Sequence, residues 1–113
     1  MKMATRWADY CISAVRYNAA HTHIDAVRVH QDLGETLGQG SSWTRTQVVA
    51  TIDRRSSICT VFKGADGKWR RGAAVEVVLL DGQRFIRTDS NQRKADNLGS
   101  LPELPAESQA ARY

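Results

Sequence analysis

The chain has 113 residues, of which 42% are hydrophobic and 25% are charged, and its formal net charge is +4. This length suits one domain and is short for two, and the composition is that of an ordinary globular protein. No apolar run approaches the roughly 18 residues that a membrane span needs, and the first residues lack a signal-peptide pattern, so we expect a cytoplasmic protein that does not contact a membrane.

Two strands are predicted near the start of the chain. Residues 8–17 are rich in β-branched and aromatic side chains, and residues 23–30 follow after a turn-like segment. In the second strand two valines alternate with Arg28 and His30, which predicts that one face is covered. We expect the two strands to form a hairpin, followed by a glycine- and serine-rich loop through Ser42.

The start of a short helix is the clearest local signal in the chain. Thr44 and Gln47 have the spacing of a capping box, in which each side chain accepts a hydrogen bond from the other residue's backbone N–H. Trp43 and Val48 then stand at the two positions of a hydrophobic staple. The helix is expected to end near Arg54–Arg55, where two cations suit the negative end of the helix dipole.

The second half of the chain predicts further strands. Residues 57–63 form an apolar strand, and residues 68–71 are expected to pair back briefly after a glycine-containing turn. The strongest hairpin comprises residues 74–80 and 83–88, because the Asp81–Gly82 pair between them favours a two-residue turn with positive φ at both positions.

A two-residue turn also fixes the register of this hairpin. Leu80 then faces Gln83, and Glu76 faces Arg87 as a cross-strand charge pair. Both faces of the hairpin are partly apolar, which predicts a central hairpin or a seam between two copies of the chain.

Polarity rises and periodicity is lost towards the C-terminus. Residues 97–105 are expected to form an extended arm on the body, and residues 105–113 a flexible end.

The predicted fold is a small single α+β domain spanning residues 1–113, with its ordered core at about 8–104. It has a mainly antiparallel sheet made of a hairpin, one short helix and three to four further strands.

Residues with metal-binding or catalytic chemistry are few. His21 and His23 share one side of an extended segment, but no third ligand is visible nearby. Cys11 and Cys59 both stand in apolar runs, which predicts two buried thiols rather than a disulfide, and neither has a histidine, lysine or helix start beside it. We therefore expect no enzyme activity, no metal and no cofactor.

The basic residues indicate binding. Residues 54–94 hold ten basic and four acidic side chains and so carry +6. Within them Lys68, Trp69, Arg70 and Arg71 place an indole among three cations, an arrangement that stacks on a base and holds phosphates. The predicted binding residues are Lys68, Trp69, Arg70, Arg71, Arg84 and Arg87, although Arg84 and Arg87 lie on opposite sides of their strand. The expected partner is anionic, either nucleic acid or an acidic or nucleoprotein complex.

An alternative belongs to a different class of protein. A homodimer or larger homo-oligomer would bind a small ligand in pockets between chains, lined by Trp43, Phe85 and the turn with His21 and His23. The mass in solution distinguishes the two.

Several ordered motifs of the chain resemble a known bacterial family. They are Ala8–Asn18, His21–Ile24, Val27–His30, Trp43–Arg45, Ile86–Asp89 and Asp96–Leu104. Over roughly residues 8–104 the sequence is similar to the family called domain of unknown function thirty-eight ninety-two. The resemblance supplies no activity, cofactor or catalytic residue. It implies that the tail through Leu104 belongs to the domain, and it favours an accessory or phage-type counter-defence inhibitor role in bacteria or their mobile elements.

Overall fold

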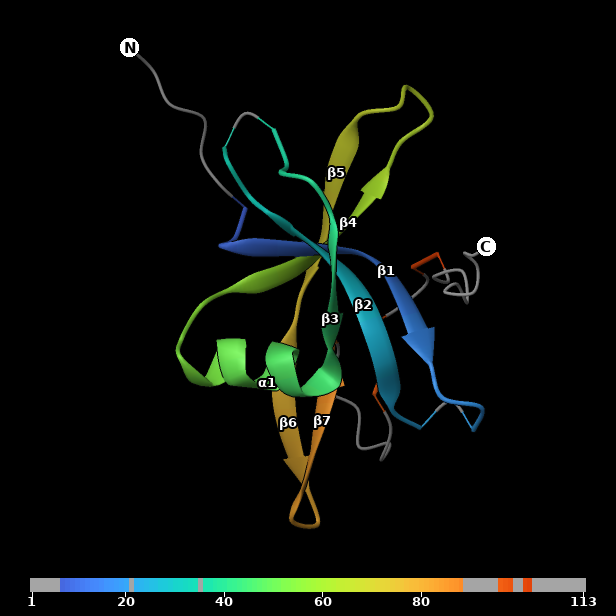
Figure 1. Cartoon of the computed structure of the whole chain (residues 1–113), viewed down its shortest axis with the longest axis vertical. Helices are drawn as coiled ribbons and strands as arrows, with labels where there is room; N and C mark the ends of the chain where they lie inside the picture. Colours follow the sequence, from blue (N-terminus) through green and yellow to red (C-terminus); the bar gives the residue numbers. More distant parts are fainter. Residues whose placement is uncertain (1–6, 21, 35, 89–95, 99–100, 103–113) are drawn as a thin grey trace.

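The computed structural model describes residues 7–20, 22–34, 36–88, 96–98 and 101–102. These residues form seven strands and one helix (Figure 1). In chain order the elements are β1 (Tyr10–Tyr17), β2 (Ile24–Gln31), β3 (Ser41–Thr44), α1 (Arg45–Asp53), β4 (Ile58–Lys63), β5 (Trp69–Ala74), β6 (Glu76–Leu80) and β7 (Gln83–Arg87).

Five of the strands form one sheet in the order β3-β2-β1-β4-β5, and β6 and β7 form a separate antiparallel pair. The predicted N-terminal hairpin is confirmed, since β1 and β2 are antiparallel neighbours. The sheet is mainly antiparallel, as expected, but it is mixed: β1 and β4 run parallel, whereas the other three neighbouring pairs are antiparallel. Parallel neighbours need a crossover connection, and the segment from β2 through β3 and α1 to β4 supplies it.

The strand β3 was not expected, because Ser41 and Ser42 belong to the predicted loop, and Trp43 and Thr44 were assigned to the start of the helix. It pairs with β2 over four positions, with Trp43 opposite Val27. Pairing with β2 outweighs the weak strand propensity of Ser41 and Ser42, since β propensity depends strongly on the neighbouring strand.

The helix α1 begins and ends as its sequence predicts. Thr44 is the N-cap, and both hydrogen bonds of the capping box with Gln47 are present. Val48 is fully buried and Trp43 packs against the same core, as a hydrophobic staple requires. The last turn closes at Arg54, whose N–H donates to the carbonyl of Ala50 at 3.1 Å. No helix in the described part of the chain is long and apolar enough to cross a membrane.

The hairpin of β6 and β7 has the predicted turn and register. Asp81 and Gly82 have φ of 51° and 77°, and Leu80 faces Gln83 while Glu76 faces Arg87. The strand expected at residues 74–80 begins only at Glu76, because pairing is interrupted at Val75. Residues 69–74 form strand β5, which is longer than the predicted segment 68–71 and pairs with β4.

The core lies on both faces of the sheet. Alternation along β1 places Ile12 in a large cluster with Val48 of α1 and Ile86 of β7. Cys11 points the other way, into a smaller cluster with Cys59. The sheet therefore separates a main core from a second apolar layer.

The described part of the C-terminal segment lies on the main core. Leu98 is 2% exposed, and the carbonyl of Pro102 accepts a hydrogen bond from the N–H of Val15 at 3.0 Å. The expectation that the arm lies on the body is thus met at residues 97–98 and 101–102. Leu104 and the end expected to be flexible, residues 105–113, lie outside the described residues.

Asp96 connects this segment to three other elements. Its carboxylate accepts hydrogen bonds from the N–H groups of Ile24 in β2 at 2.7 Å and Ile86 in β7 at 2.8 Å. The Arg45 guanidinium at the start of α1 binds the same carboxylate at 2.8 Å. The Asp96 side chain is fully buried, so a single charged group holds the hairpin, the helix and the sheet together.

Candidate functional site

The segment Lys68–Arg71 comprises the residue before strand β5 and the first three residues of that strand, at the upper end of the molecule in Figure 1. The turn before it is fixed locally: Gly64 donates to the carbonyl of Lys68 at 2.9 Å, and the Asp66 carboxylate accepts from the Lys68 N–H at 3.0 Å. The strand β5 lies at the edge of the sheet. Because side chains alternate along a strand, Trp69 and Arg71 point to one face of the sheet and Arg70 points to the other.

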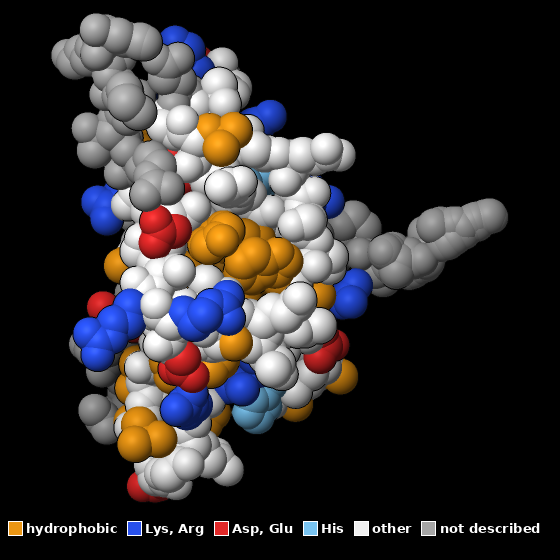
Figure 2. All heavy atoms as spheres, turned by 60° about the vertical axis from the view of Figure 1, so that its left-hand side comes forward, with side chains coloured by type: hydrophobic (Ala, Val, Ile, Leu, Met, Phe, Trp, Pro, Cys, Tyr) orange, Lys and Arg blue, Asp and Glu red, His pale blue; other side chains and the backbone are white. Residues whose placement is uncertain are grey.

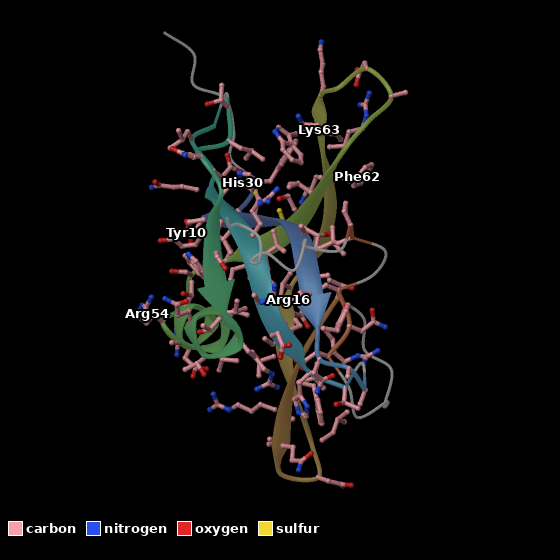
Figure 3. All side chains as sticks on the ribbon, turned by 45° about the vertical axis from the view of Figure 1, so that its right-hand side comes forward. Tyr10, Arg16, His30, Arg54, Phe62 and Lys63 are labelled. Carbon is pink, nitrogen blue, oxygen red and sulfur yellow. The ribbon has the colours of Figure 1, made fainter. Side chains whose placement is uncertain are left out.

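Trp69 lies among basic side chains from other strands. Lys63 faces it across the β4–β5 pair, with its Nζ 5.1 Å from the indole centroid, a cation–π contact. The His30 ring lies 5.4 Å away at a tilt of 55°. Figure 3 places His30 on β2 and Lys63 on β4 in the upper part of the molecule, away from Arg16 and Arg54 below.

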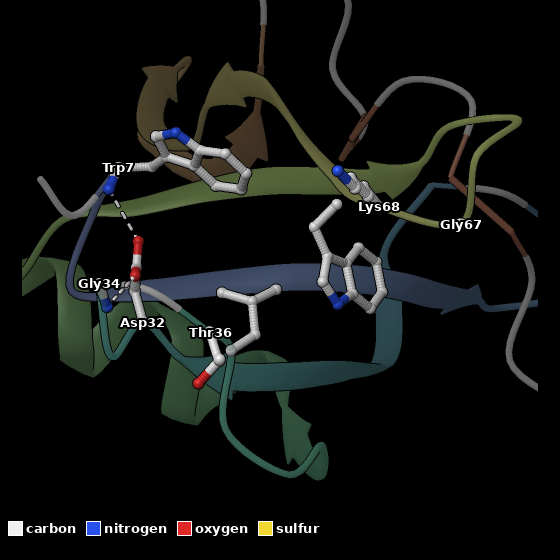
Figure 4. A pocket seen from close by; sticks show the side chains of 8 residues that line it. Trp7, Asp32, Gly34, Thr36, Gly67 and Lys68 are labelled. Atoms are coloured by element: carbon white, nitrogen blue, oxygen red, sulfur yellow. Dashed lines mark hydrogen bonds between the residues drawn. The ribbon is translucent and has the colours of Figure 1, made fainter. Parts of the chain in front are cut away.

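One hollow opens beside Trp69 towards the N-terminal segment (Figure 4). It has a volume of about 450 Å³ and is lined by Trp7, Asp32, Gly34, Thr36, Leu37, Gly67, Lys68 and Trp69. The Asp32 carboxylate is buried and accepts the N–H of Trp7 at 2.7 Å and that of Gly34 at 2.9 Å. This buried acid therefore fixes the two loops that form one wall of the hollow.

A second hollow of about 370 Å³ meets the first at Trp69. It is lined by Ser13, Ala14, Arg28, His30, Phe62, Lys63, Trp69 and Pro102. The imidazole of His30 has a fixed orientation, because its Nε2 is 2.7 Å from Ser13 Oγ and its Nδ1 is 2.9 Å from the Gly38 carbonyl. We call the five residues Arg28, His30, Lys63, Lys68 and Trp69 the Trp69 surface.

The other predicted binding residues are dispersed. Arg70 points away from Trp69 and forms an exposed ion pair with Asp66 at 3.1 Å. Arg84 lies on the β6–β7 hairpin at the opposite end of the molecule and pairs with Asp53 at 2.8 Å. Figure 2 shows basic and acidic side chains side by side over this lower end, so it carries no uniform charge.

Arg87 was expected at the surface, and the structure buries it completely. The C-terminal segment is the cause, because Asn97 pairs with β7 beside Arg87: its N–H donates to the Ile86 carbonyl at 2.8 Å, and its carbonyl accepts from Thr88 at 2.9 Å. Of the six predicted binding residues, Trp69 and Arg71 therefore share one face of the sheet, and Lys68 lines the first hollow beside Trp69.

Sequence reasoning missed Lys63, His30, Arg28 and Trp7 as neighbours of this site. The alternation of Arg28 and His30 with two valines was a usable signal, since it predicts that both point away from the main core. The expected pairing of residues 68–71 with the strand 57–63 also brings Lys63 close to Trp69, whereas nothing in the sequence indicated that Trp7 lies across the hollow.

The two cysteines lie beneath the same site. Both are buried as free thiols, and Leu37 and Trp69 pack over their cluster. Their sulfur atoms are 3.8 Å apart, and Cys11 Sγ is also 3.8 Å from an oxygen of Asp32. The hydrogen bond between the thiols and burial raise the pKa of Cys11. The same hydrogen bond, together with the Arg71 guanidinium, lowers the pKa of Cys59.

The residues of the alternative interpretation are mostly engaged in packing. Phe85 is 1% exposed and stacks on the His23 ring at 5.8 Å, and Trp43 packs on Tyr10 at 5.0 Å. His21 lies outside the described residues. Within the described ranges no three His, Cys, Asp or Glu side chains are grouped as a metal site.

Comparison with known proteins gives one match. The search of curated proteins and the search of solved structures found none. The scan against protein families matches residues 11–102 to a family described as protein of unknown function DUF3892. This confirms the resemblance to domain of unknown function thirty-eight ninety-two, and because the match covers all seven strands apart from the first residue of β1, the chain belongs to the DUF3892 family.

Proposed function

We propose that this protein is a non-catalytic binding module whose Trp69 surface binds single-stranded nucleic acid. The observation that carries the proposal is the position of Trp69: its half-buried indole stands where two hollows meet, and basic side chains line both of them. An aromatic ring flanked by cations is the usual arrangement of proteins that bind unpaired bases and their phosphates.

The charges around Trp69 support an anionic ligand. Arg28, Lys63 and Lys68 come from β2, from β4 and from the residue before β5, so the fold gathers cations that are far apart in sequence. Among the described residues, Asp66 pairs with Arg70, and Asp32 is the one acid that lines either hollow, against the three cations. The Trp69 surface therefore keeps a positive charge that attracts phosphates.

Single strands fit this surface better than a duplex. Stacking on an indole needs a base that is not already stacked within a helix, and each such contact contributes about 1–3 kcal/mol. Trp69 lines both hollows, which offer space beside the indole for consecutive nucleotides.

Fluorescence anisotropy with labelled single-stranded and duplex oligonucleotides over a salt series tests the proposal. We expect tighter binding to single strands and an affinity that falls as salt rises, because bound phosphates release counterions. The double variant Lys63→Gln/Lys68→Gln should weaken binding and reduce the salt slope by up to about 1.4, which is about 0.7 for each lost phosphate contact on a single strand.

Arg84→Gln is the control for the position of the charge, because it removes one positive charge, half the change of the double variant, at the far end of the molecule, where Arg84 pairs with Asp53. We expect it to leave the affinity nearly unchanged. Failure of every oligonucleotide to bind at low salt, or equal losses in the control and the double variant, would overturn the proposal.

The competing function, a homo-oligomer that binds a small ligand between chains, has less support. Phe85, one of its three predicted lining positions, is buried against His23 and so lines no open pocket. A mass measurement in solution that finds only monomers excludes this function without affecting the first.

A further inference from the structure

The strongest remaining feature is the pair of cysteines under the Trp69 surface. Cys11 in β1 and Cys59 in β4 are register partners in the two parallel central strands. Neighbouring strands are about 4.8 Å apart, within the range that a disulfide bridges between Cα atoms. The sulfur atoms need to approach by only about 1.8 Å from their separation of 3.8 Å to reach bonding distance.

The surroundings give the two sulfur atoms different roles. The Arg71 guanidinium and the hydrogen bond from Cys11 favour the thiolate of Cys59, which is the nucleophilic form of a cysteine. Cys11 lies next to the Asp32 carboxylate, which disfavours a second negative charge. Cys59 is therefore the attacking sulfur and Cys11 the resolving one.

We propose that Cys11 and Cys59 form a redox-modification site, in which a small hydroperoxide oxidises the two thiols to a disulfide between β1 and β4. The proposal rests on the register and separation of the two residues, and it does not depend on nucleic-acid binding.

The chemistry takes place in two steps. The Cys59 thiolate attacks one peroxide oxygen, so an S–O bond forms, the O–O bond breaks, and the leaving hydroxide or alkoxide takes up the proton that Cys59 lost. The Cys11 sulfur then attacks Cys59: the S–S bond forms, the S–O bond breaks, and the hydroxide leaves with the Cys11 proton as water. The two sulfur atoms together supply the two electrons that reduce the peroxide.

Burial selects the class of oxidant. Cys11 and Cys59 are 0% and 1% exposed, and Leu37 and Trp69 cover them. A brief local opening admits a molecule the size of hydrogen peroxide more readily than a bulky disulfide such as oxidised glutathione. The proposal therefore predicts a preference for the smaller oxidant.

The test exposes the reduced full chain to hydrogen peroxide or to oxidised glutathione, followed by unfolding, alkylation and mass spectrometry. After peroxide we expect monomers with no alkylated cysteine and a cross-linked peptide pair containing Cys11 and Cys59, with much less product from glutathione disulfide. Two alkylated cysteines, over-oxidised Cys59 without a cross-link, or disulfide-linked dimers would overturn the proposal.

Arg71→Gln and Arg70→Gln form a matched pair for the assigned roles. Arg71 lies on the cysteine side of β5, whereas Arg70 points to the opposite face. We expect the first variant to slow disulfide formation by about threefold or more through a smaller thiolate fraction, and the second to leave the rate unchanged. Equal rates in the two variants would refute the role of Arg71 and, with it, Cys59 as the attacking sulfur.

Discussion

Replacing Asp96 with alanine should severely destabilise the protein, although Asp96 lies outside every strand and helix. The substitution leaves the buried N–H groups of Ile24 and Ile86 without their acceptor, and each such loss costs about 1–3 kcal/mol. It also removes the carboxylate that pairs with Arg45, which is 26% exposed and can therefore be partly rehydrated. The two lost acceptors together should lower the free energy of unfolding by about 2–6 kcal/mol, a large part of the 5–15 kcal/mol typical of a domain.

Urea denaturation followed by tryptophan fluorescence measures this loss. Asp96→Asn should fall between the wild type and Asp96→Ala, because each carboxylate oxygen serves one of the two N–H groups and asparagine keeps only one oxygen. The stability of Asp96→Asn can therefore still be measured if Asp96→Ala does not fold.

Asp53→Ala is the control for Asp96→Ala. It breaks an ion pair whose partners are both half exposed, and it should change the stability by no more than about 1 kcal/mol. A loss below about 1 kcal/mol for Asp96→Ala, or one equal to that of the control, would refute the view that Asp96 joins the hairpin, helix and sheet.

Two further predictions concern packing and ionisation. Gly72→Ala should destabilise the protein by about 1–3 kcal/mol in thermal melts, because the new Cβ would lie 2.2 Å from Thr60 Oγ1 and 3.0 Å from its carbonyl oxygen. Gly38→Ala is the control, because its Cβ would lie 3.4 Å from its nearest neighbour, the Gln31 carbonyl oxygen, and equal melting temperatures for the two variants would contradict this account. Titration of the reduced folded protein by thiolate absorbance should show one ionisation per chain below the ordinary thiol pKa, since the pKa of Cys59 is lowered and that of Cys11 is raised. Two thiols that ionise together would contradict the opposed shifts.

The features that could be predicted from the sequence are those that depend on neighbouring residues. The capping box needs only Thr44 and Gln47, and the tight turn needs only Asp81 and Gly82, so both were correct in position and geometry. The register of β6 and β7 followed directly from that turn.

The features that were missed depend on residues far apart in the chain. Strand β3 exists because β2 pairs with it, and the parallel pairing of β1 with β4 is not encoded in either strand alone. The burial of Arg87 follows from residues 96–98 lying against β7, which no local pattern indicates.

The candidate site shows the same division. The basic run with Trp69 was visible in the sequence, and the expected pairing of residues 57–63 with 68–71 brings Lys63 close to it, whereas His30 joins it only through the sheet. In the same way Arg71 reaches Cys59 only because β5 pairs with β4, so no neighbour in sequence could indicate a perturbed thiol.

The most direct test of the central claim is the fluorescence of Trp69 itself. The chain has three tryptophans, so the variant Trp7→Phe/Trp43→Phe retains Trp69 as the only indole. Adding a single-stranded oligonucleotide should quench this emission in a saturable way, with the same dissociation constant as anisotropy reports, because a base stacks on the ring. Emission that stays unchanged while the oligonucleotide is bound would contradict the claim that Trp69 is the stacking platform.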